Sequence, residues 1–181
     1  MNKGFYITTP IYYVNDKPHI GHAYTTILAD VLARFNRNTG MDTFFLTGLD
    51  EHGQKVQEAA ELRGIAPKKH CDEMAPRFTE LWDRLHISND DFIRTTEDRH
   101  KKIVQLILQR VMDNGDIYEA EYEGLYSVSE ERFITEKEAE SGQFRDIKNL
   151  KEKNYFFKMS KYQQRLIEHI QTNQKFIQPE H

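Results

Sequence analysis

The chain of 181 residues has a single cysteine, Cys71, and no long apolar run. One cysteine excludes an internal disulfide and a zinc site built from several cysteines. The sequence offers no stretch of about 20 apolar residues for a membrane span, and Met1–Gly4 lead into a strand pattern without the apolar segment of a secretory signal. We therefore expect a cytoplasmic protein without membrane contact, in which Cys71 is structural.

Charge is nearly balanced, with 25 Lys and Arg residues against 29 Asp and Glu residues. A net charge of −4 does not favour a general nucleic-acid-binding surface, and we expect no DNA partner. The densest basic stretch, residues 148–161, is equally well explained as a solvated face. Hydrophobic residues make up 38% of the chain, which is enough for a packed core.

Apolar periodicity predicts alternating strands and helices as far as Gly115. Such alternation is typical of a parallel sheet covered by helices, in which ligands bind at the carboxyl ends of strands. Beyond a boundary near residue 116, we expect short antiparallel strands and an exposed charged segment over 136–153. Strands are predicted at 4–9, 43–47, 92–96 and 154–159, of which the first two are expected to be buried, and residues 10–18 are expected to form a loop. Helices are predicted at 20–39, 55–62, 67–85 and 160–172, the last with Ser160 as its cap. A further helix is expected to start with a cap formed by Thr95 and Asp98 and to end at Gly115.

The tetrapeptide His19-Ile20-Gly21-His22 follows the first strand and its loop and opens the first helix. Unpaired backbone N–H groups and the helix dipole make a helix N-terminus attractive to phosphate. Two imidazoles three residues apart lie on one helical face, and both can donate to a phosphoryl oxygen. Gly21 lets a nucleotide approach the backbone closely. Taken alone, these residues are equally compatible with histidines that only cap the helix or face solvent.

The flanking residues resemble the signature regions of class I aminoacyl-tRNA synthetases, and of their methionine-specific members in particular. The first match runs over residues 8–25, and the second is Thr47-Gly48-Leu49-Asp50-Glu51-His52-Gly53. The resemblance implies that methionine and ATP form methionyl-adenylate, with Mg2+ accompanying the nucleotide, and that tRNA(Met) then receives the methionyl group. His19 and His22 would be catalytic and ATP-binding residues that stabilise charge on the phosphoryl oxygens, and Gly21 would lie against the adenine.

The same resemblance implies a set of methionine contacts. Asp50 would pair with the α-ammonium group, and Tyr13 would close over the thioether chain, where sulfur–ring contact and apolar burial give affinity. The alternatives are a cap at Asp50 for a helix starting near His52, and simple core packing for the aromatic rings. The other methionine contacts would come from Pro10, Ile11 and Tyr12.

Several residues near these motifs have ordinary explanations. Trp82 lies on a helical apolar stripe and is expected in the core. Thr95, Thr96 and His100 follow the third strand and could border the site, but capping accounts for the threonines. His52 could face nucleotide, tRNA or only solvent, and we assign it no role.

Residues 158–161, Lys-Met-Ser-Lys, resemble the loop with which the family grips ATP phosphates. We interpret them otherwise, because the family's loop lies beyond the connective insertion and usually ends in a second serine, where this chain has Tyr162. Many relatives also carry a cysteine-built zinc knuckle in that insertion. This chain has no cysteine in that region, and Ser127 and residues 140–142 stand where some relatives place zinc ligands. We therefore predict no structural zinc.

The resemblance covers nearly all of this sequence but only the first portion of the family's catalytic core. It implies an α/β fold in which residues 1–116 are the N-terminal half of a Rossmann-type catalytic domain. Residues 117–181 would be a partial, zinc-free α+β connective-peptide domain. We expect the chain alone to be weakly active or inactive, because half of the phosphate grip is absent. The alternatives are another nucleotidyltransferase with the same histidine signature, or a module that binds nucleotide or methionine without catalysis.

Overall fold

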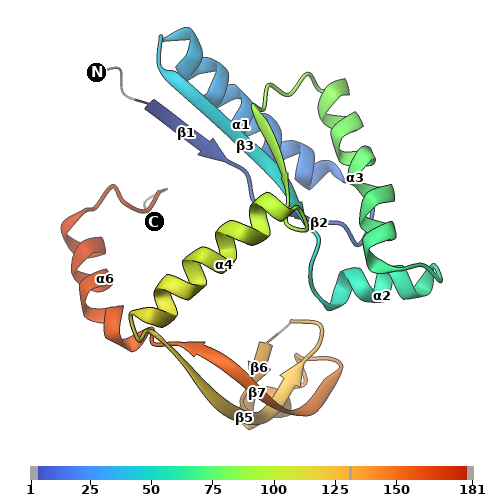
Figure 1. Cartoon of the computed structure of the whole chain (residues 1–181), viewed down its shortest axis with the longest axis vertical. Helices are drawn as coiled ribbons and strands as arrows, with labels where there is room; N and C mark the ends of the chain where they lie inside the picture. The colour runs from blue at the N-terminus through green and yellow to red at the C-terminus, as the bar shows by residue number, and fades with distance from the viewer. Residues whose placement is uncertain (1–3, 131, 179–181) are drawn as a thin grey trace. The chain divides into compact units, whose positions relative to one another are not determined.

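The computed structural model describes residues 4–130 and 132–178, and the chain divides into two compact units, residues 1–105 and 106–181 (Figure 1). Within these described ranges, no helix is both long enough and apolar enough to cross a membrane. The first unit contains a parallel sheet with helices, and the second contains an antiparallel sheet with helices.

The sheet of the first unit is built around β3 (Asp42–Asp50). Strands β1 (Gly4–Thr8) and β2 (Tyr12–Tyr13) pair with one side of β3 in succession, and β4 (Asp91–Arg94) pairs with the other side. All three pairings are parallel, which confirms the predicted α/β sheet. The loop expected over residues 10–18 therefore contains a short strand, because Tyr12 and Tyr13 continue the pairing that β1 begins.

Three helices of this unit agree closely with the sequence pattern. Helix α1 (Ile20–Asn38) packs its small residues against Phe45 of β3. Helix α2 (Gln54–Leu62) leads into α3 (Pro67–Arg84), which starts with a proline in its first turn. The buried side of α3 forms the larger core cluster, with Met74, Phe78 and Trp82 among its members.

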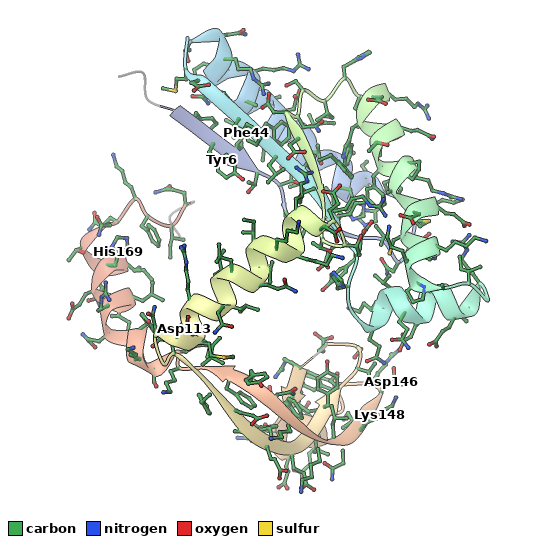
Figure 2. The ribbon with its side chains drawn as sticks, in the orientation of Figure 1. Tyr6, Phe44, Asp113, Asp146, Lys148 and His169 are labelled. Atoms are coloured by element: carbon green, nitrogen blue, oxygen red, sulfur yellow. The ribbon has the colours of Figure 1, made fainter. Side chains whose placement is uncertain are left out.

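One face of β1 and β3 is open within the first unit, contrary to the prediction that both strands are buried. Tyr6 is 61% exposed, and its ring stacks on that of Phe44 with centroids 5.9 Å apart (Figure 2). Side chains alternate along a strand, so Phe45 faces α1 while Phe44 faces the opposite side. The strand prediction was correct, but the prediction of burial was wrong for this face.

Helix α4 (Asp98–Asp113) spans the sequence boundary between the two units and has no buried residue. The cap predicted from Thr95 and Asp98 is not formed by the threonine. The Thr95 hydroxyl instead accepts a hydrogen bond from the Glu51 backbone N–H at 2.9 Å. The predicted domain boundary near residue 116 follows α4 and stays a prediction.

In the second unit, β5 (Ile117–Ser127) pairs antiparallel with β6 (Arg132–Ile134) and with β7 (Ile147–Phe157). Two predictions are corrected, because β5 is not short and β7 begins at Ile147 rather than at residue 154. The segment 136–153 is mostly exposed, as expected. Lysine–glutamate pairs join β5 and β7, including Lys153 with Glu119 at 2.9 Å. A short helix, α5 (Glu136–Glu140), follows β6.

The lysines of residues 158–161 make structural contacts in the second unit. Lys158 Nζ donates to the Gly115 carbonyl at 2.7 Å, and Lys161 pairs with the buried carboxylate of Asp116. Both ammonium groups are thus engaged near the start of β5. Helix α6 (Ser160–Thr172) follows, but its cap residue is Met159 without a side-chain hydrogen bond, so the predicted cap at Ser160 is wrong.

Candidate active site

The N-terminus of α1 is capped by its own histidines. His19 is the cap residue, and its Nδ1 accepts a hydrogen bond from the Gly21 backbone N–H at 3.1 Å. His22 completes a capping box, since its Nδ1 accepts from the His19 backbone N–H at 3.2 Å. The capping role that the sequence left as an alternative is therefore real, and it uses only one nitrogen of each ring.

These two hydrogen bonds define the tautomer of each imidazole. A nitrogen that accepts from a backbone N–H carries no proton, so the neutral ring holds its proton on Nε2. Neither Nε2 atom of His19 and His22 has a partner in the part of the chain that the structure describes. The helix start therefore presents two N–H donors in addition to its backbone amides.

The two rings stack with centroids 3.8 Å apart and an interplanar angle of 24°. Burial lowers the pKa of His22 below its ordinary value of 6.5, and the neighbouring His19 lowers it further. Two protonated rings at this distance would repel each other. His22 is therefore suited to act as a neutral donor near pH 7.

The position of the His19 ring leaves no room for a side chain at Gly21. A Cβ atom at this position would lie 3.0 Å from His19 Cε1 and 3.1 Å from its Nδ1. Such contacts are tighter than those that side chains normally make, so alanine would push the ring aside. The sequence analysis explained this glycine by the close approach of a nucleotide. The structure adds a second reason, which is the space that the His19 ring needs.

The two tyrosines of the loop differ in their surroundings. Tyr12 is a core residue, and its hydroxyl forms a hydrogen bond with Thr26 Oγ1 at 2.8 Å. Its ring also contacts His22, with centroids 4.7 Å apart. Tyr13 is 41% exposed, and Lys55 Nζ lies 5.8 Å from its ring centroid. Core packing thus accounts for Tyr12 but not for Tyr13.

A cavity of about 440 Å³ adjoins the start of α1. It brings together both histidines with the loop that follows β1. Pro10, Gly21 and Asp50 do not line it. Asn15, Asp16 and Lys17 of the same loop do line the cavity, although the sequence analysis gave them no role. The lining consists of Ile11, Tyr12, Tyr13, Asn15, Asp16, Lys17, His19 and His22.

Asp50 ends β3 at the carboxyl edge of the sheet. Its Oδ1 accepts a hydrogen bond from the His52 backbone N–H at 3.3 Å, in a local turn. Helix α2 has Gly53 as its cap residue and no side-chain cap, so the alternative of a helix cap at Asp50 is wrong. The carboxylate of Asp50 is half-buried and makes no ion pair within the described residues.

His70 makes a structural contact beside the site that the sequence did not signal. It is buried on α3, and its Nε2 donates to the Val14 carbonyl at 2.7 Å. Its Nδ1 lies 3.0 Å from a guanidinium nitrogen of Arg63, which can only donate, and this contact fixes the tautomer. His70 thereby ties the loop that carries Tyr13 to the body of the unit. An isolated histidine within a charged helical stretch gave no sequence signal for this contact.

The remaining candidates take structural places. Trp82 is buried as expected, although its Nε1 has no partner within the described ranges. Cys71 is buried, and burial raises the pKa of its thiol to about 11, which keeps it protonated. Exposed His52 contacts the Thr95 carbonyl through Nε2 at 3.2 Å, and His100 is half-buried.

Residues 4–130 and 132–178 contain no group of three or more His, Cys, Asp or Glu side chains that could hold a metal ion. Ser127 is buried, and its hydroxyl contacts that of Ser129 at 3.1 Å. The absence of structural zinc stays a prediction.

A parallel sheet with its helices, and a helix N-terminus with two imidazole donors beside a cavity, are features of a nucleotide-binding α/β protein. Within that class the chain belongs to the family described as tRNA synthetases class I (M), whose model matches residues 5–143.

Relatives of this chain carry the corresponding name. Methionine–tRNA ligase of Fusobacterium nucleatum is 53% identical over 184 residues, which is 99% of this chain and 29% of that protein. The Rickettsia bellii protein of the same name is 51% identical over 183 residues, or 99% of this chain and 36% of that protein. The chain thus spans about a third of the length of these relatives.

A solved structure confirms the Rossmann-type fold class. Mycobacterium tuberculosis methionyl-tRNA synthetase in complex with methionyl-adenylate matches this structure with a TM-score of 0.91 at 39% sequence identity. The match covers 98% of this chain and 36% of the other.

Proposed function

We propose that this chain supplies the imidazole pair and the methionine-binding residues of a methionine–tRNA ligase. In the reaction, a carboxylate oxygen of methionine attacks the α-phosphorus of ATP, and the bond to the leaving pyrophosphate breaks. The methionyl group of the adenylate then passes to the 3′ end of tRNA(Met). No protein nucleophile is needed, so the protein must align the reactants and stabilise charge on the phosphoryl oxygens.

The stacked histidines carry this proposal. Backbone amides occupy Nδ1 of both His19 and His22, which leaves two Nε2–H groups at a helix N-terminus beside a cavity. Donors held in advance at the place where negative charge develops are worth several kcal/mol of barrier lowering, roughly 3 for one donor. Gly21 keeps His19 in place and leaves the helix start open to the adenine.

The methionine side of the proposal rests on Asp50 and the loop after β1. Asp50 has a half-buried carboxylate without an ion pair in the described part of the chain, which suits it to bind an ammonium group. Tyr13 is exposed next to the cavity and can cover a thioether, whereas Tyr12 supports His22 from the core. Pro10, Ile11 and the cavity-lining ring of Tyr12 complete the proposed methionine contacts.

The proposed reaction also needs Mg2+ and the remaining length of the relatives. Mg2+ would arrive bound to the phosphates of ATP, as part of the substrate. Because the chain spans only about a third of its relatives, we propose that alone it binds ligands but forms adenylate weakly or not at all. This is the specific reason to keep the non-catalytic binding module as a second candidate. A protonated, buried Cys71 suits the reduced cytoplasm in which we place the enzyme.

A chimaera tests the proposal directly. Residues 1–181 replace the matching segment of the Fusobacterium nucleatum relative, which restores the remaining length. We expect methionine-dependent exchange of pyrophosphate into ATP, with little exchange for other amino acids, and aminoacylation of tRNA(Met). Replacing both histidines, His19→Ala and His22→Ala, should reduce the exchange rate by at least about a hundredfold.

The same experiment separates the alternatives. A folded chimaera that shows no methionine-dependent exchange, but transfers nucleotidyl groups to phosphorylated alcohols, would favour another nucleotidyltransferase. Calorimetry of the 181-residue chain with methionine and with ATP examines the binding module. Robust adenylate formation by the 181-residue chain alone would contradict the proposal that it needs the remaining length.

A further inference from the structure

Between Asp50 and His52 lies a charged residue that the structure buries completely. The side chain of Glu51 is 0% exposed, although its neighbours on both sides are half-buried or exposed. Burial of a carboxylate is unfavourable unless ionic and hydrogen-bond partners compensate for lost water. The contacts around Glu51 therefore need an explanation.

Three residues at the end of β4 hold Glu51. Arg94 Nε donates to Glu51 Oε1 at 2.6 Å, and the Thr96 hydroxyl donates to Oε2. The Glu51 backbone N–H donates to Thr95 Oγ1 at 2.9 Å. Both carboxylate oxygens and the amide are thus bound to one short segment, residues 94–96, and we call these contacts the Glu51 clamp.

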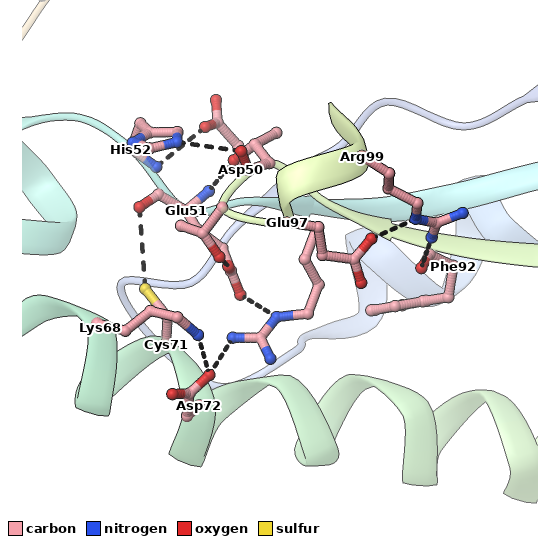
Figure 3. A network of polar contacts seen from close by, with 12 residues as sticks. Asp50, Glu51, His52, Lys68, Cys71, Asp72, Phe92, Glu97 and Arg99 are labelled. Atoms are coloured by element: carbon pink, nitrogen blue, oxygen red, sulfur yellow. Dashed lines mark hydrogen bonds and ion pairs between the residues drawn. The ribbon is translucent and has the colours of Figure 1, made fainter. Parts of the chain in front are cut away.

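The Glu51 clamp is also attached to α3. A terminal guanidinium nitrogen of Arg94 donates to Asp72 Oδ1 at 2.6 Å, and the same carboxylate pairs with Lys68. Figure 3 shows Glu51 reaching from the end of β3 toward Asp72 and Lys68, while Asp50 and His52 lie farther from that helix. The end of β3 is therefore joined to both β4 and α3 by charged groups.

The contacts on either side of Glu51 follow from this arrangement. Adjacent side chains of an extended chain point to opposite sides, so burying Glu51 turns Asp50 away from the core. His52 Nε2 meets the Thr95 carbonyl at 3.2 Å on the same segment. Arg94 neutralises the charge of Glu51, which leaves Asp50 as the carboxylate of this pair that is free to bind a cation.

We propose that Glu51, held by Arg94 and Thr96, is a positioning residue that fixes the backbone of residues 50–52 and so places the Asp50 carboxylate for the ammonium group of the amino-acid substrate. The inference rests on the function proposed above. It assigns to Glu51 no contact with substrate. Its effect is on the binding of methionine rather than of ATP, because the imidazole pair is fixed by separate local bonds.

The proposal is tested by measuring the KM values for methionine and ATP of the chimaera that carries Glu51→Gln. Glutamine keeps the size but removes the charge that Arg94 pairs with, and its amide cannot accept at both positions. We expect the methionine KM to rise about tenfold or more, with the ATP KM changed less than about threefold. Thr96→Val removes one hydroxyl donor and should raise the methionine KM by about threefold.

Asp30→Asn is the matched control. Asp30 is a buried carboxylate of α1 that also pairs with an arginine, Arg34, and accepts from a hydroxyl, that of Ser88 at 2.6 Å. Its replacement should lower the melting temperature as Glu51→Gln does, but leave the methionine KM within about twofold. Equal losses of melting temperature in both variants, with the methionine KM unchanged in both, would overturn the proposal and leave Glu51 a purely structural residue.

A measurement on the 181-residue chain keeps the inference testable if the chimaera is inactive or Glu51→Gln fails to fold in it. Backbone amide NMR signals of residues 50–52 should shift in Thr96→Val, while those of residues 19–22 stay in place. Signals of 50–52 that do not move would overturn the inference. An unsubstituted chimaera that folds without forming methionyl-adenylate would contradict the proposed function, whatever the NMR result.

Discussion

The two ends of the candidate site are held by different kinds of contact. At the imidazole end, the bonds that fix the rings join residues two or three positions apart, from His19 to Gly21 and to His22. At the acidic end, Glu51 is held by Arg94 and Thr96, which are 43 and 45 positions away. The first arrangement needs only the start of a helix, whereas the second needs the assembled sheet.

This difference determines how each end should respond to mutation. Local contacts at a helix terminus persist as long as the helix forms, and their loss changes the site more than the fold. Contacts across the sheet are part of the core, so their loss changes both. Variants at glycine and tyrosine positions of the two ends can separate these effects.

The largest effect is expected for Gly48→Ala, which breaks the acidic end through the sheet. A Cβ on Gly48 of β3 would lie 2.1 Å from the Ile93 carbonyl oxygen of β4 and 2.5 Å from Ile93 Cγ2. Because backbone would have to move, we expect a loss of about 3 kcal/mol or more in the free energy of unfolding. Urea denaturation of the 181-residue chain, followed by circular dichroism, measures it.

The control for Gly48→Ala is Gly4→Ala, where the nearest contact of the added Cβ is an ordinary 3.7 Å. It should change the unfolding free energy by less than about 1 kcal/mol. Equal stability of the two variants would show that β4 does not approach β3 as closely as the Glu51 clamp requires.

Gly21→Ala should break the imidazole end and spare the fold. The added methyl group would push the His19 ring, whereas alanine is favoured over glycine within a helix by roughly 1 kcal/mol. We expect unchanged or slightly higher stability, together with at least a tenfold loss of methionine-dependent pyrophosphate exchange in the chimaera. Unchanged exchange would mean that the position of the His19 ring is not critical.

The contrast between local and distant contacts also explains which features the sequence could predict. The helix start at residues 19–22, the boundaries of α1, and the proline at the start of α3 follow from neighbouring residues. The parallel sheet follows from the alternation of strands and helices. The helix features were predicted because the residues that cause them lie within a few positions of one another, and the sheet was predicted from the order of its elements.

Several of the missed features depend on partners that are distant in the sequence. The roles of Thr95 and Thr96 were assigned to capping, because nothing in the sequence links them to Glu51. His70 gave no signal for its contact with Val14, 56 positions away. The resemblance to known synthetases proposed a role for Asp50, but nothing in the sequence indicated that its neighbour Glu51 is buried and bound by Arg94 and Thr96.

Tyr12→Phe lies between the two extremes, because the Tyr12 hydroxyl meets Thr26 only 14 positions away. Thr26 Oγ1 also donates to the His22 carbonyl at 2.9 Å, so it keeps one partner when the phenol is lost. We expect a loss of about 1 kcal/mol in unfolding free energy. The exposed Tyr6 provides the control, since Tyr6→Phe should be nearly neutral in the same urea titration. Equal losses would contradict the role of the Tyr12 hydroxyl in joining the loop to α1.

The smallest expected effect is the change in the pKa of His22 when His19 is replaced by alanine. Burial and the adjacent His19 place the pKa of His22 below 6.5, and His19→Ala should raise it because the neighbouring charge and part of the covering ring are lost. The unfolded chain binds this proton more readily than the folded one. The stabilising contribution of neutral His22 is therefore complete above pH 6.5 and is lost as the pH falls through the lowered pKa. Ring signals in a ¹H–¹³C NMR titration of the 181-residue chain measure both values, and a His22 midpoint at or above 6.5, unmoved by His19→Ala, would contradict the neutral donor pair.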